Sequence, residues 1–399
     1  MTTVILVTPL LDPSSSVRGF LAGHVRGLAD EFERVVIVAG AVAADAAAPG
    51  AIAPGVEVVQ GPDGDAHAIE FALAGALDDV EGRVVVVVQD DLRCLVQARA
   101  VTRESSVPLL WWCTQIPSTR AATEAARWAD GLVVAAPPLA EVPGCRAWTV
   151  GAGVDVATSY PTLTPVPPRP PFRLLALGRT AAVKGLPVVL RAVAIARSHG
   201  LDARLRIVGP STNASEWQHR AELEALVKNI ALSSVVQIDD GVEPGEIPEI
   251  LRQSHVLVDA GGDDDISISV LEAMAAGRAV VTASRRVAAI LPDSQPTLTF
   301  DAGNAFELAE RIVALDETWT TGLPRIGLAL REVVERQHSL DRWQEQFATA
   351  VDEVRFDATD GLGNKGPGAE GSNGSGPGPA GVPGASITGP PPSAAAGHS

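Results

Sequence analysis

Cysteine and lysine are scarce in this 399-residue chain. The three cysteines (Cys94, Cys113 and Cys145) are too few and too widely spaced for a disulfide framework or a zinc site. Only three of the 31 basic residues are lysines, and 48 acidic residues bring the formal net charge to −17. So acidic a chain lacks the basic surface that a general nucleic-acid-binding protein needs, and an anionic membrane repels it on average.

Long hydrophobic runs are also missing. No stretch approaches the roughly 20 apolar residues that a membrane span requires. The apolar run near the amino terminus has only about seven residues and no basic leader, which favours a buried first strand over a signal peptide. Apolar residues make up 46% and charged residues 20% of the chain, as in ordinary globular proteins. We therefore expect a two-domain protein of the cytoplasm without a transmembrane segment.

Two proline-rich segments divide the chain. Six of the eleven residues 161–171 are proline, which fixes the backbone and removes hydrogen-bond donors, so this segment is predicted to be a linker. Residues 358–399 are rich in Gly and Pro and have few large apolar side chains, which predicts a disordered tail. The predicted domains are residues 1–160 and 172–336, with a helix over 337–357 that crosses back to the first domain.

Short apolar runs recur in both halves, separated by Ala- and Leu-rich stretches of helical length. This alternation predicts parallel strands buried on both faces, and hence an α/β chain of two Rossmann-like domains. Such sheets bind ligands beyond the carboxyl ends of their strands, so two facing domains place the site in an interdomain cleft. The runs cover residues 4–8, 34–39, 84–88, 132–136, 173–178, 204–209, 235–238, 255–260 and 279–284.

The first candidate motif follows the run at 173–178. Gly178 and Arg179 end that strand, and Lys184 and Gly185 precede the next helix. Two cations five residues apart at one strand end suit a polyanion such as a diphosphate. The loop has no P-loop pattern, and such a motif by itself is more often a solvated basic turn.

The second candidate motif surrounds the start of a later helix. Asp264 and Glu272 are eight residues apart, and Ser267 or Ser269 can cap the helix between them. Free backbone N–H groups near Ile268 and Ser269 form an anion site at the positive end of the helix. Glu272, one turn further on, can accept hydrogen bonds from ribose hydroxyls. Taken alone, two such carboxylates are often surface charges.

Together these residues resemble family 4 glycosyltransferases, which are retaining enzymes of the GT-B fold. The resemblance extends over about residues 1–357 and is specific after Pro171. The family pattern is a Gly-Arg…Lys-Gly loop, a strand that ends in Val-Gly, and two acids in E-x7-E that lead into E-A-M-A-x-G. Here these positions are Gly178-Arg179, Lys184-Gly185, Val208-Gly209, Asp264, Glu272, Ala273, Met274, Ala275 and Gly277.

The resemblance implies a hexosyltransferase (EC 2.4) that moves a sugar from a nucleoside-diphosphate sugar to a sugar, lipid-linked or small-molecule acceptor. Retention would follow a front-face mechanism without metal or other cofactor. Arg179 and Lys184 would hold the donor diphosphate, Glu272 the ribose, and Asp264 the donor sugar. Other residues implied in donor binding are Gly178, Gly209, Ser267, Ile268 and Ser269.

Several positions depart from the family pattern. Asp264 is one methylene shorter than the usual Glu, and the first loop has the single Gly19 in place of Gly-Gly. The family commonly has a histidine after the fourth or fifth strand of its amino-terminal domain, and this chain lacks it. The corresponding segment has Trp112 and Thr114 instead. Gly19, His24, Trp112 and Thr114 are the acceptor-side candidates, although His24 and Trp112 also suit core packing.

Two other functions compete with this prediction. The run 263–265 is three aspartates, which superficially matches a metal-binding motif of another glycosyltransferase class. Because Arg179 and Lys184 already supply positive charge for a diphosphate, a metal is not expected. The other alternative is a non-catalytic protein that binds sugar nucleotides and serves as a partner or regulatory subunit.

Overall fold

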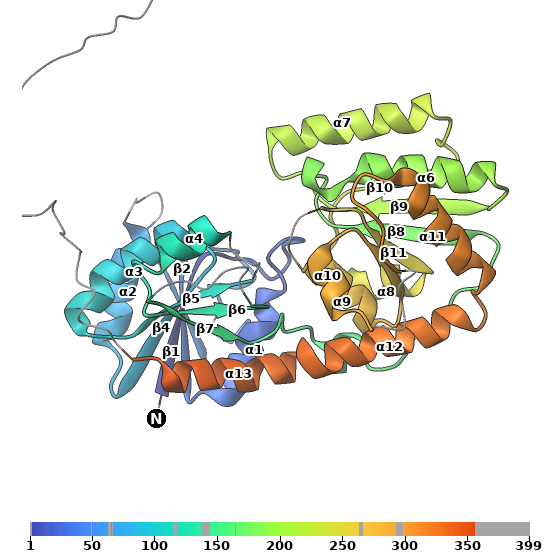
Figure 1. Ribbon diagram of the computed structural model, residues 1–399. Coiled ribbons are helices and arrows are strands. Elements are labelled where there is room, and N and C mark those ends of the chain that lie inside the picture. Colours follow the sequence, from blue (N-terminus) through green and yellow to red (C-terminus); the bar gives the residue numbers. More distant parts are fainter. Residues whose placement is uncertain are drawn as a thin grey trace, which may run out of the picture. The chain divides into compact units, whose positions relative to one another are not determined.

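Two parallel β-sheets, each covered by helices, form the part of the chain that the computed structural model describes (Figure 1). The described residues are 2–48, 50–62, 65, 67–114, 118–137, 144–163, 165–262, 266–292 and 298–355. They belong to one compact unit, Met1–Thr359. The predicted tail over 358–399 lies outside them.

The first sheet has seven strands in the order β3-β2-β1-β4-β5-β6-β7, and every pairing is parallel. Its strands are β1 (Thr2–Leu11), β2 (Arg34–Val42), β3 (Val56–Gln60), β4 (Arg83–Gln89), β5 (Leu109–Cys113), β6 (Gly131–Val134) and β7 (Arg146–Thr149). Helices α1 (Leu21–Glu31), α2 (Ala68–Asp78), α3 (Leu92–Ser105), α4 (Thr119–Ala125) and the short α5 (Val156–Ser159) connect or follow them.

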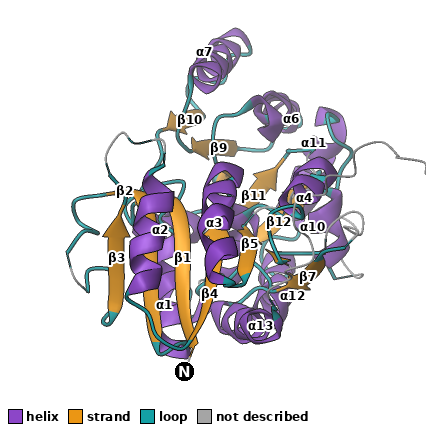
Figure 2. Ribbon diagram, turned by 90° about the vertical axis from the view of Figure 1, so that its left-hand side faces the viewer, coloured by secondary structure: helices purple, strands orange, loops and turns teal. Residues whose placement is uncertain are grey.

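Alternate side chains of β1 pack into two different hydrophobic cores, one on each face of the sheet. Val4 and Leu6 pack on the face covered by α1, whereas Ile5 and Val7 pack on the face covered by α2 and α3. Figure 2 shows α2 and α3 in front of this sheet. Both faces are therefore dry, which explains why the sequence of a central strand is an unbroken apolar run.

The second sheet has five parallel strands in the order β10-β9-β8-β11-β12. The strands are β8 (Phe172–Leu177), β9 (Ala203–Val208), β10 (Val236–Asp239), β11 (Val256–Asp259) and β12 (Ala279–Thr282). The helical elements are η1 (Ala182–Lys184), α6 (Leu186–Ser198), α7 (Ala214–Asn229), η2 (Pro244–Glu246), α8 (Ile247–Arg252), α9 (Ile268–Ala275), α10 (Arg285–Ile290), α11 (Ala305–Glu317) and α12 (Gly322–Gln337). All nine apolar runs overlap strands, so the expectation of two Rossmann-like sheets is confirmed.

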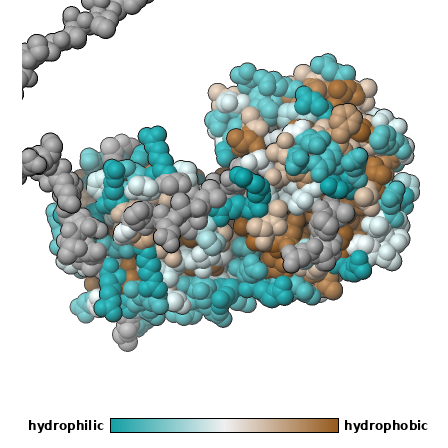
Figure 3. Space-filling view, viewed as in Figure 1, coloured by the Kyte–Doolittle hydropathy of each residue, from teal (hydrophilic) through white to brown (hydrophobic). Residues whose placement is uncertain are grey.

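The last described helix, α13 (Leu340–Glu353), packs on the first sheet although it follows the second in sequence. Trp343 and Phe347 enter the core that contains Val4 and Leu6. The outer surface of α12 and α13 is largely hydrophilic (Figure 3). Within the described ranges, no helix has both the length and the apolar character needed to cross a bilayer.

Candidate functional site

The carboxyl ends of β8 and β9 meet so closely that only glycine fits at one position. The backbone N–H of Gly178 donates to the Val208 carbonyl over 2.9 Å. A Cβ atom on Gly209 would lie 1.9 Å from the Gly178 carbonyl oxygen, well inside van der Waals contact. The loop that carries Arg179 thus packs directly against the end of β9, and a residue larger than glycine does not fit at position 209.

Helix α9 begins where the sequence predicts, but its first turn differs from expectation. Ser267 is the N-cap residue, yet its side chain accepts no capping hydrogen bond, and the Ser267 and Ser269 hydroxyls bond to each other at 2.8 Å. The prediction of a serine side-chain cap is therefore wrong. Without that cap, the amide groups of the first turn keep their capacity to bind an anion.

A glycine follows the carboxyl end of α9. Gly277 has φ 69°, in the left-handed region that favours glycine. Its N–H donates to Met274, and the N–H of Arg278 donates to Ala273. This paired arrangement closes the helix and fixes the position of Glu272 one turn from the helix start.

A cavity of about 380 Å³ lies between these elements; we call it the C-terminal cavity. Most residues predicted to bind a donor line it, although they come from four separate segments of the second half. From the first half, Gly19 and neighbouring loop residues close it. The predicted residues on its walls are Gly19, Gly178, Arg179, Lys184, Gly209, Ser267, Ile268, Ser269 and Glu272.

Among the described residues that line this cavity, Glu272 alone is acidic. Burial raises the pKa of its carboxyl group to about 7, because the ionised form loses hydration there. The pKa of Tyr160 is also raised, first by burial and then by the charge of Glu272. Because the buried Glu272 carboxylate has lost hydration, a ligand that donates hydrogen bonds to it, such as a pair of hydroxyls, would stabilise its ionised form.

Arg179 has a partner that the sequence did not reveal. Its Nη1 atom lies 2.7 Å from Oε1 of Glu216, whose other oxygen accepts from the Thr212 N–H and hydroxyl at 2.7 and 2.8 Å. Burial would raise the pKa of Glu216, but these hydrogen bonds and the Arg179 charge lower it below its ordinary value. Glu216 therefore orients Arg179 and neutralises part of its charge.

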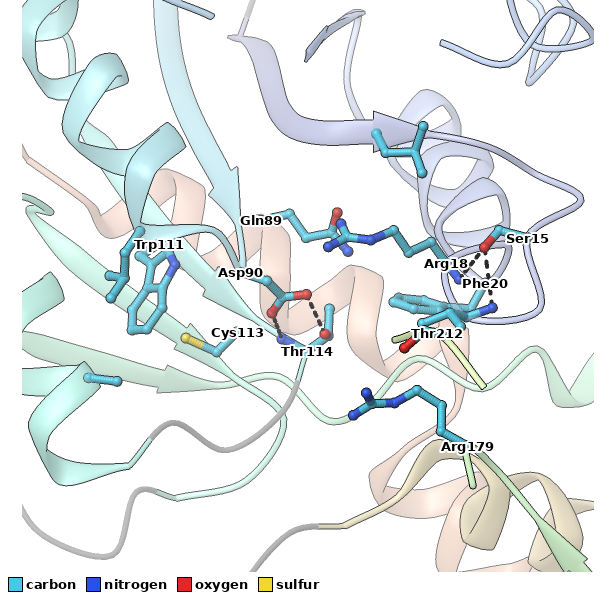
Figure 4. A pocket seen from close by; sticks show the side chains of 14 residues that line it. Ser15, Arg18, Phe20, Gln89, Asp90, Trp111, Cys113, Thr114, Arg179 and Thr212 are labelled. Carbon is cyan, nitrogen blue, oxygen red and sulfur yellow. Dashed lines mark hydrogen bonds between the residues drawn. The ribbon is translucent and has the colours of Figure 1, made fainter. Parts of the chain in front are cut away.

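A second cavity, of about 680 Å³, opens beside the carboxyl ends of β4 and β5; we call it the N-terminal cavity (Figure 4). Asp90, with φ 56°, accepts from the Thr114 N–H at 2.8 Å and from its hydroxyl at 2.6 Å. Four residues line both cavities: Ser15, Val17, Phe20 and Arg179. The two cavities are therefore neighbours.

Residues 171–317 match a family model described as Glycosyl transferases group 1. This segment is a glycosyltransferase group 1 domain. It contains Arg179, Lys184 and Glu272, the charged residues on the described wall of the C-terminal cavity, and also Glu216, the partner of Arg179. The match confirms the family that the two sequence motifs indicate.

Known proteins resemble the chain beyond this domain. The D-inositol 3-phosphate glycosyltransferase of Arthrobacter sp. (strain FB24) is 27% identical over 180 residues, 43% of this chain and 42% of that protein. The match thus spans less than half the length of this curated relative. Sucrose-phosphate synthase from Thermosynechococcus elongatus aligns with a TM-score of 0.71 and 14% identity over 89% of this chain and 99% of its own. Anabaena Alr3699/HepE in complex with UDP-glucose aligns with a TM-score of 0.70 and 16% identity, covering 88% and 99%. The structural neighbours confirm the GT-B fold.

Outside the group 1 domain, the acceptor-side candidates lie in different places. Thr114 lines the N-terminal cavity. His24 and Trp112 are each 2% exposed and pack against Trp343 in the core. Both side chains therefore have the core-packing role that the sequence also allowed, and not a position for acceptor contact. The neighbouring Trp111, on the opposite face of β5, lines the N-terminal cavity instead.

The acidic run of the group 1 domain remains a sequence prediction. Residues 263–265, including the predicted sugar contact Asp264, lie outside the described residues. Within the described ranges, no group of three His, Cys, Asp or Glu side chains could hold a metal ion.

Proposed function

We propose that this chain is a glycosyltransferase that moves a sugar from a nucleoside-diphosphate sugar to an acceptor hydroxyl. The observation that carries the proposal is the C-terminal cavity, where Arg179, Lys184, the start of α9 and Glu272 face one space. Two cations and free backbone amides suit a diphosphate, and a buried carboxylate suits a ribose. The Anabaena neighbour in complex with UDP-glucose makes a UDP-sugar the first donor to test.

In this mechanism the chain stabilises the leaving group. The bond between the sugar carbon and the diphosphate oxygen breaks, and negative charge develops on the nucleoside diphosphate. Arg179, held by Glu216, and Lys184 would oppose that charge, together with the amides near Ile268 and Ser269. Fixed charges of this kind act most strongly in the transition state, because they need no reorganisation as the bond breaks.

We further propose that transfer retains the anomeric configuration. Asp90 is the acidic residue among the described residues that line the N-terminal cavity, and both its oxygens accept hydrogen bonds from Thr114. A carboxylate so engaged is a poor nucleophile toward the sugar. In a front-face mechanism the acceptor oxygen bonds to the sugar carbon, and its proton passes to the departing phosphate oxygen. NMR of the product tests this, since an inverted anomeric centre would refute it.

A donor panel tests the activity itself. UDP-, GDP- and ADP-glucose are titrated by calorimetry, and the release of nucleoside diphosphate is measured with and without acceptors. We expect one nucleotide sugar to bind and to be cleaved without added metal, also in EDTA. Binding without any release would favour the non-catalytic alternative. Absence of binding by every nucleotide would refute a donor site in this cavity.

A further inference from the structure

A third cavity, of about 530 Å³, opens at the amino ends of β8, β9 and β10; we call it the arginine cavity. Arg173 and Arg204 are the second residues of β8 and β9, and Val236 is the first residue of β10. A strand rises about 3.3 Å per residue, so the length of β8 puts roughly 15–20 Å between Arg173 and Gly178 at its other end. Among the described residues, the arginine cavity and the C-terminal cavity have no lining residue in common. The arginine cavity is therefore separate from the proposed donor site.

The described walls of the arginine cavity contain three arginines and no acidic residue. Arg206 is neutralised from outside the wall, because its Nε atom lies 2.6 Å from Oδ2 of Asp239. The Arg173 side chain donates to the Pro168 carbonyl at 3.1 Å, and Arg204 makes no hydrogen bond or ion pair with a described residue. Within the described ranges, two guanidinium charges thus have no acidic partner, in a chain whose formal net charge is −17.

The two arginines without an acidic partner lie side by side. Arg173 and Arg204 are direct neighbours in the register of β8 and β9, and adjacent strands are about 5 Å apart. Like charges at such positions repel each other and destabilise a sheet. Arg204 is exposed and Arg173 is half-buried, so both side chains have access to one ligand in the cavity. An anion between them would remove this repulsion and accept charge-assisted hydrogen bonds from both.

A phosphate monoester fits this pair of charges better than a carboxylate does. Its two negative charges match two guanidinium groups, whereas a carboxylate supplies only one charge. Other wall residues add hydroxyl and amide groups, which suit the hydroxyls of a sugar or a ribose: Ser233, Ser234, Gln237 and Gln253. The cavity volume is also in the range of small-molecule sites and larger than a free phosphate ion requires.

We propose that the arginine cavity is a second ligand site of this chain, which binds a small phosphorylated metabolite through Arg173 and Arg204. The site does not depend on the proposed function, because it lies at the opposite end of the strands from the donor cavity and shares no described residue with it. A concave site of this volume suits a small molecule better than the surface of a protein partner.

The test compares phosphorylated probes with their neutral counterparts. The full chain is titrated by calorimetry with glucose 6-phosphate, ribose 5-phosphate and AMP, and with glucose, ribose and adenosine. Inorganic phosphate tests the anion alone, glucuronate the carboxylate alternative, and hexaglutamate an acidic protein segment. We expect at least one phosphorylated probe to bind tenfold or more tightly than its neutral counterpart. Equal affinities within every pair would overturn the inference, as would tighter binding of phosphate alone, glucuronate or hexaglutamate than of every phosphorylated probe.

Three variants identify the residue responsible. Arg204→Gln should lower the affinity for the phosphorylated probe at least tenfold, and Arg204→Lys should recover part of it by keeping the charge. Arg191→Gln is the matched control, because Arg191 is exposed on α6 and does not line the arginine cavity. If Arg204→Gln binds the probe as tightly as Arg191→Gln, the inference fails.

Thermal unfolding without ligand separates lost binding from lost folding. The midpoint of Arg204→Gln should be no lower than that of the wild type, because one of two neighbouring like charges has been removed. A lower midpoint would contradict the repulsion on which the inference rests.

Arg179→Ala distinguishes the two cavities, since a phosphorylated probe can also enter the C-terminal cavity. Binding of the probe should persist in Arg179→Ala and be lost in Arg204→Gln. The reverse pattern would assign the phosphate to the donor cavity and overturn the inference. UDP affinity belongs to the proposed function and should not change in Arg204→Gln, so the proposed function and this inference can fail separately.

Discussion

The two halves of the molecule build their cavities in different ways. In the second half, the walls come from short motifs placed directly at strand ends and at one helix start, so neighbouring residues in sequence serve one site. The other cavity takes its walls from the ends of β1, β4 and β5 and from loops near them, and Arg179 and Thr212 of the second half complete these walls. The proposed donor side of the site can thus be recognised from local motifs, whereas the predicted acceptor side depends on which face of each strand a side chain occupies.

The largest expected effect tests whether the second half supplies the cations that stabilise the leaving diphosphate. Arg179→Ala or Lys184→Ala should lower kcat/KM by about 10²- to 10³-fold, the usual loss for one transition-state electrostatic contact. Steady-state kinetics with the active donor measures it, and thermal unfolding checks that the fold persists. Arg191→Ala, on the exposed side of α6, is the control and should keep wild-type activity. Wild-type turnover in both cavity variants would contradict the assignment.

A second prediction concerns the close contact between β8 and β9. Gly209→Ala should destabilise the chain by about 2 kcal/mol, since its Cβ must displace the Gly178 carbonyl and overpacking has costs of this size. Denaturant unfolding gives the free energy directly. Gly245→Ala is the control, because no atom lies within 4 Å of its added Cβ. Equal stability of the two variants would show that the strand ends separate easily.

The third prediction concerns the departure from the family pattern at Asp264. Asp264→Glu should retain activity or change donor-sugar preference, since the longer side chain restores the usual reach. Asp264→Asn should lose at least about tenfold in kcat/KM, equivalent to about 1.4 kcal/mol, because the charge is removed. Kinetics with several sugar donors would measure both. Equal activity of wild type and the two variants would make Asp264 an ordinary surface charge.

A smaller effect should appear in the pH dependence of donor binding. With the pKa of Glu272 at about 7, the carboxylate is mostly ionised at pH 8 and mostly protonated at pH 6. The ionised form accepts hydrogen bonds from the two ribose hydroxyls more strongly than the protonated form, so UDP-glucose affinity should fall several-fold as the pH drops from 8 to 6. Glu272→Gln should bind more weakly and show no such change. Parallel pH profiles in calorimetry would exclude Glu272 as the source.

The same difference between halves explains what the sequence could predict. Most central strands are apolar on both faces and were found as apolar runs, whereas β3, β5 and β7 were not among those runs. The central strand β5 is fully buried, but β3 and β7 are the edges of the first sheet, and most of their residues are exposed or only partly buried. A strand covered on one side has a mixed sequence that resembles a loop.

Contacts between distant residues could not be predicted. Asn213 caps α7 and has a Glu three residues later, a local signal for a helix start, but nothing local indicates that Glu216 binds Arg179, 37 residues earlier. Similarly, the two tryptophans of β5 look equivalent in sequence. Only the packing of the sheet places Trp111 on the cavity and Trp112 against α13.

A crystal structure of the chain with a bound UDP-sugar tests the central claim most directly. The account predicts the ligand in the C-terminal cavity, with the diphosphate between Arg179, Lys184 and the first turn of α9, and the ribose hydroxyls on Glu272. A nucleotide sugar bound elsewhere, or in this cavity without contact to either cation, would contradict it.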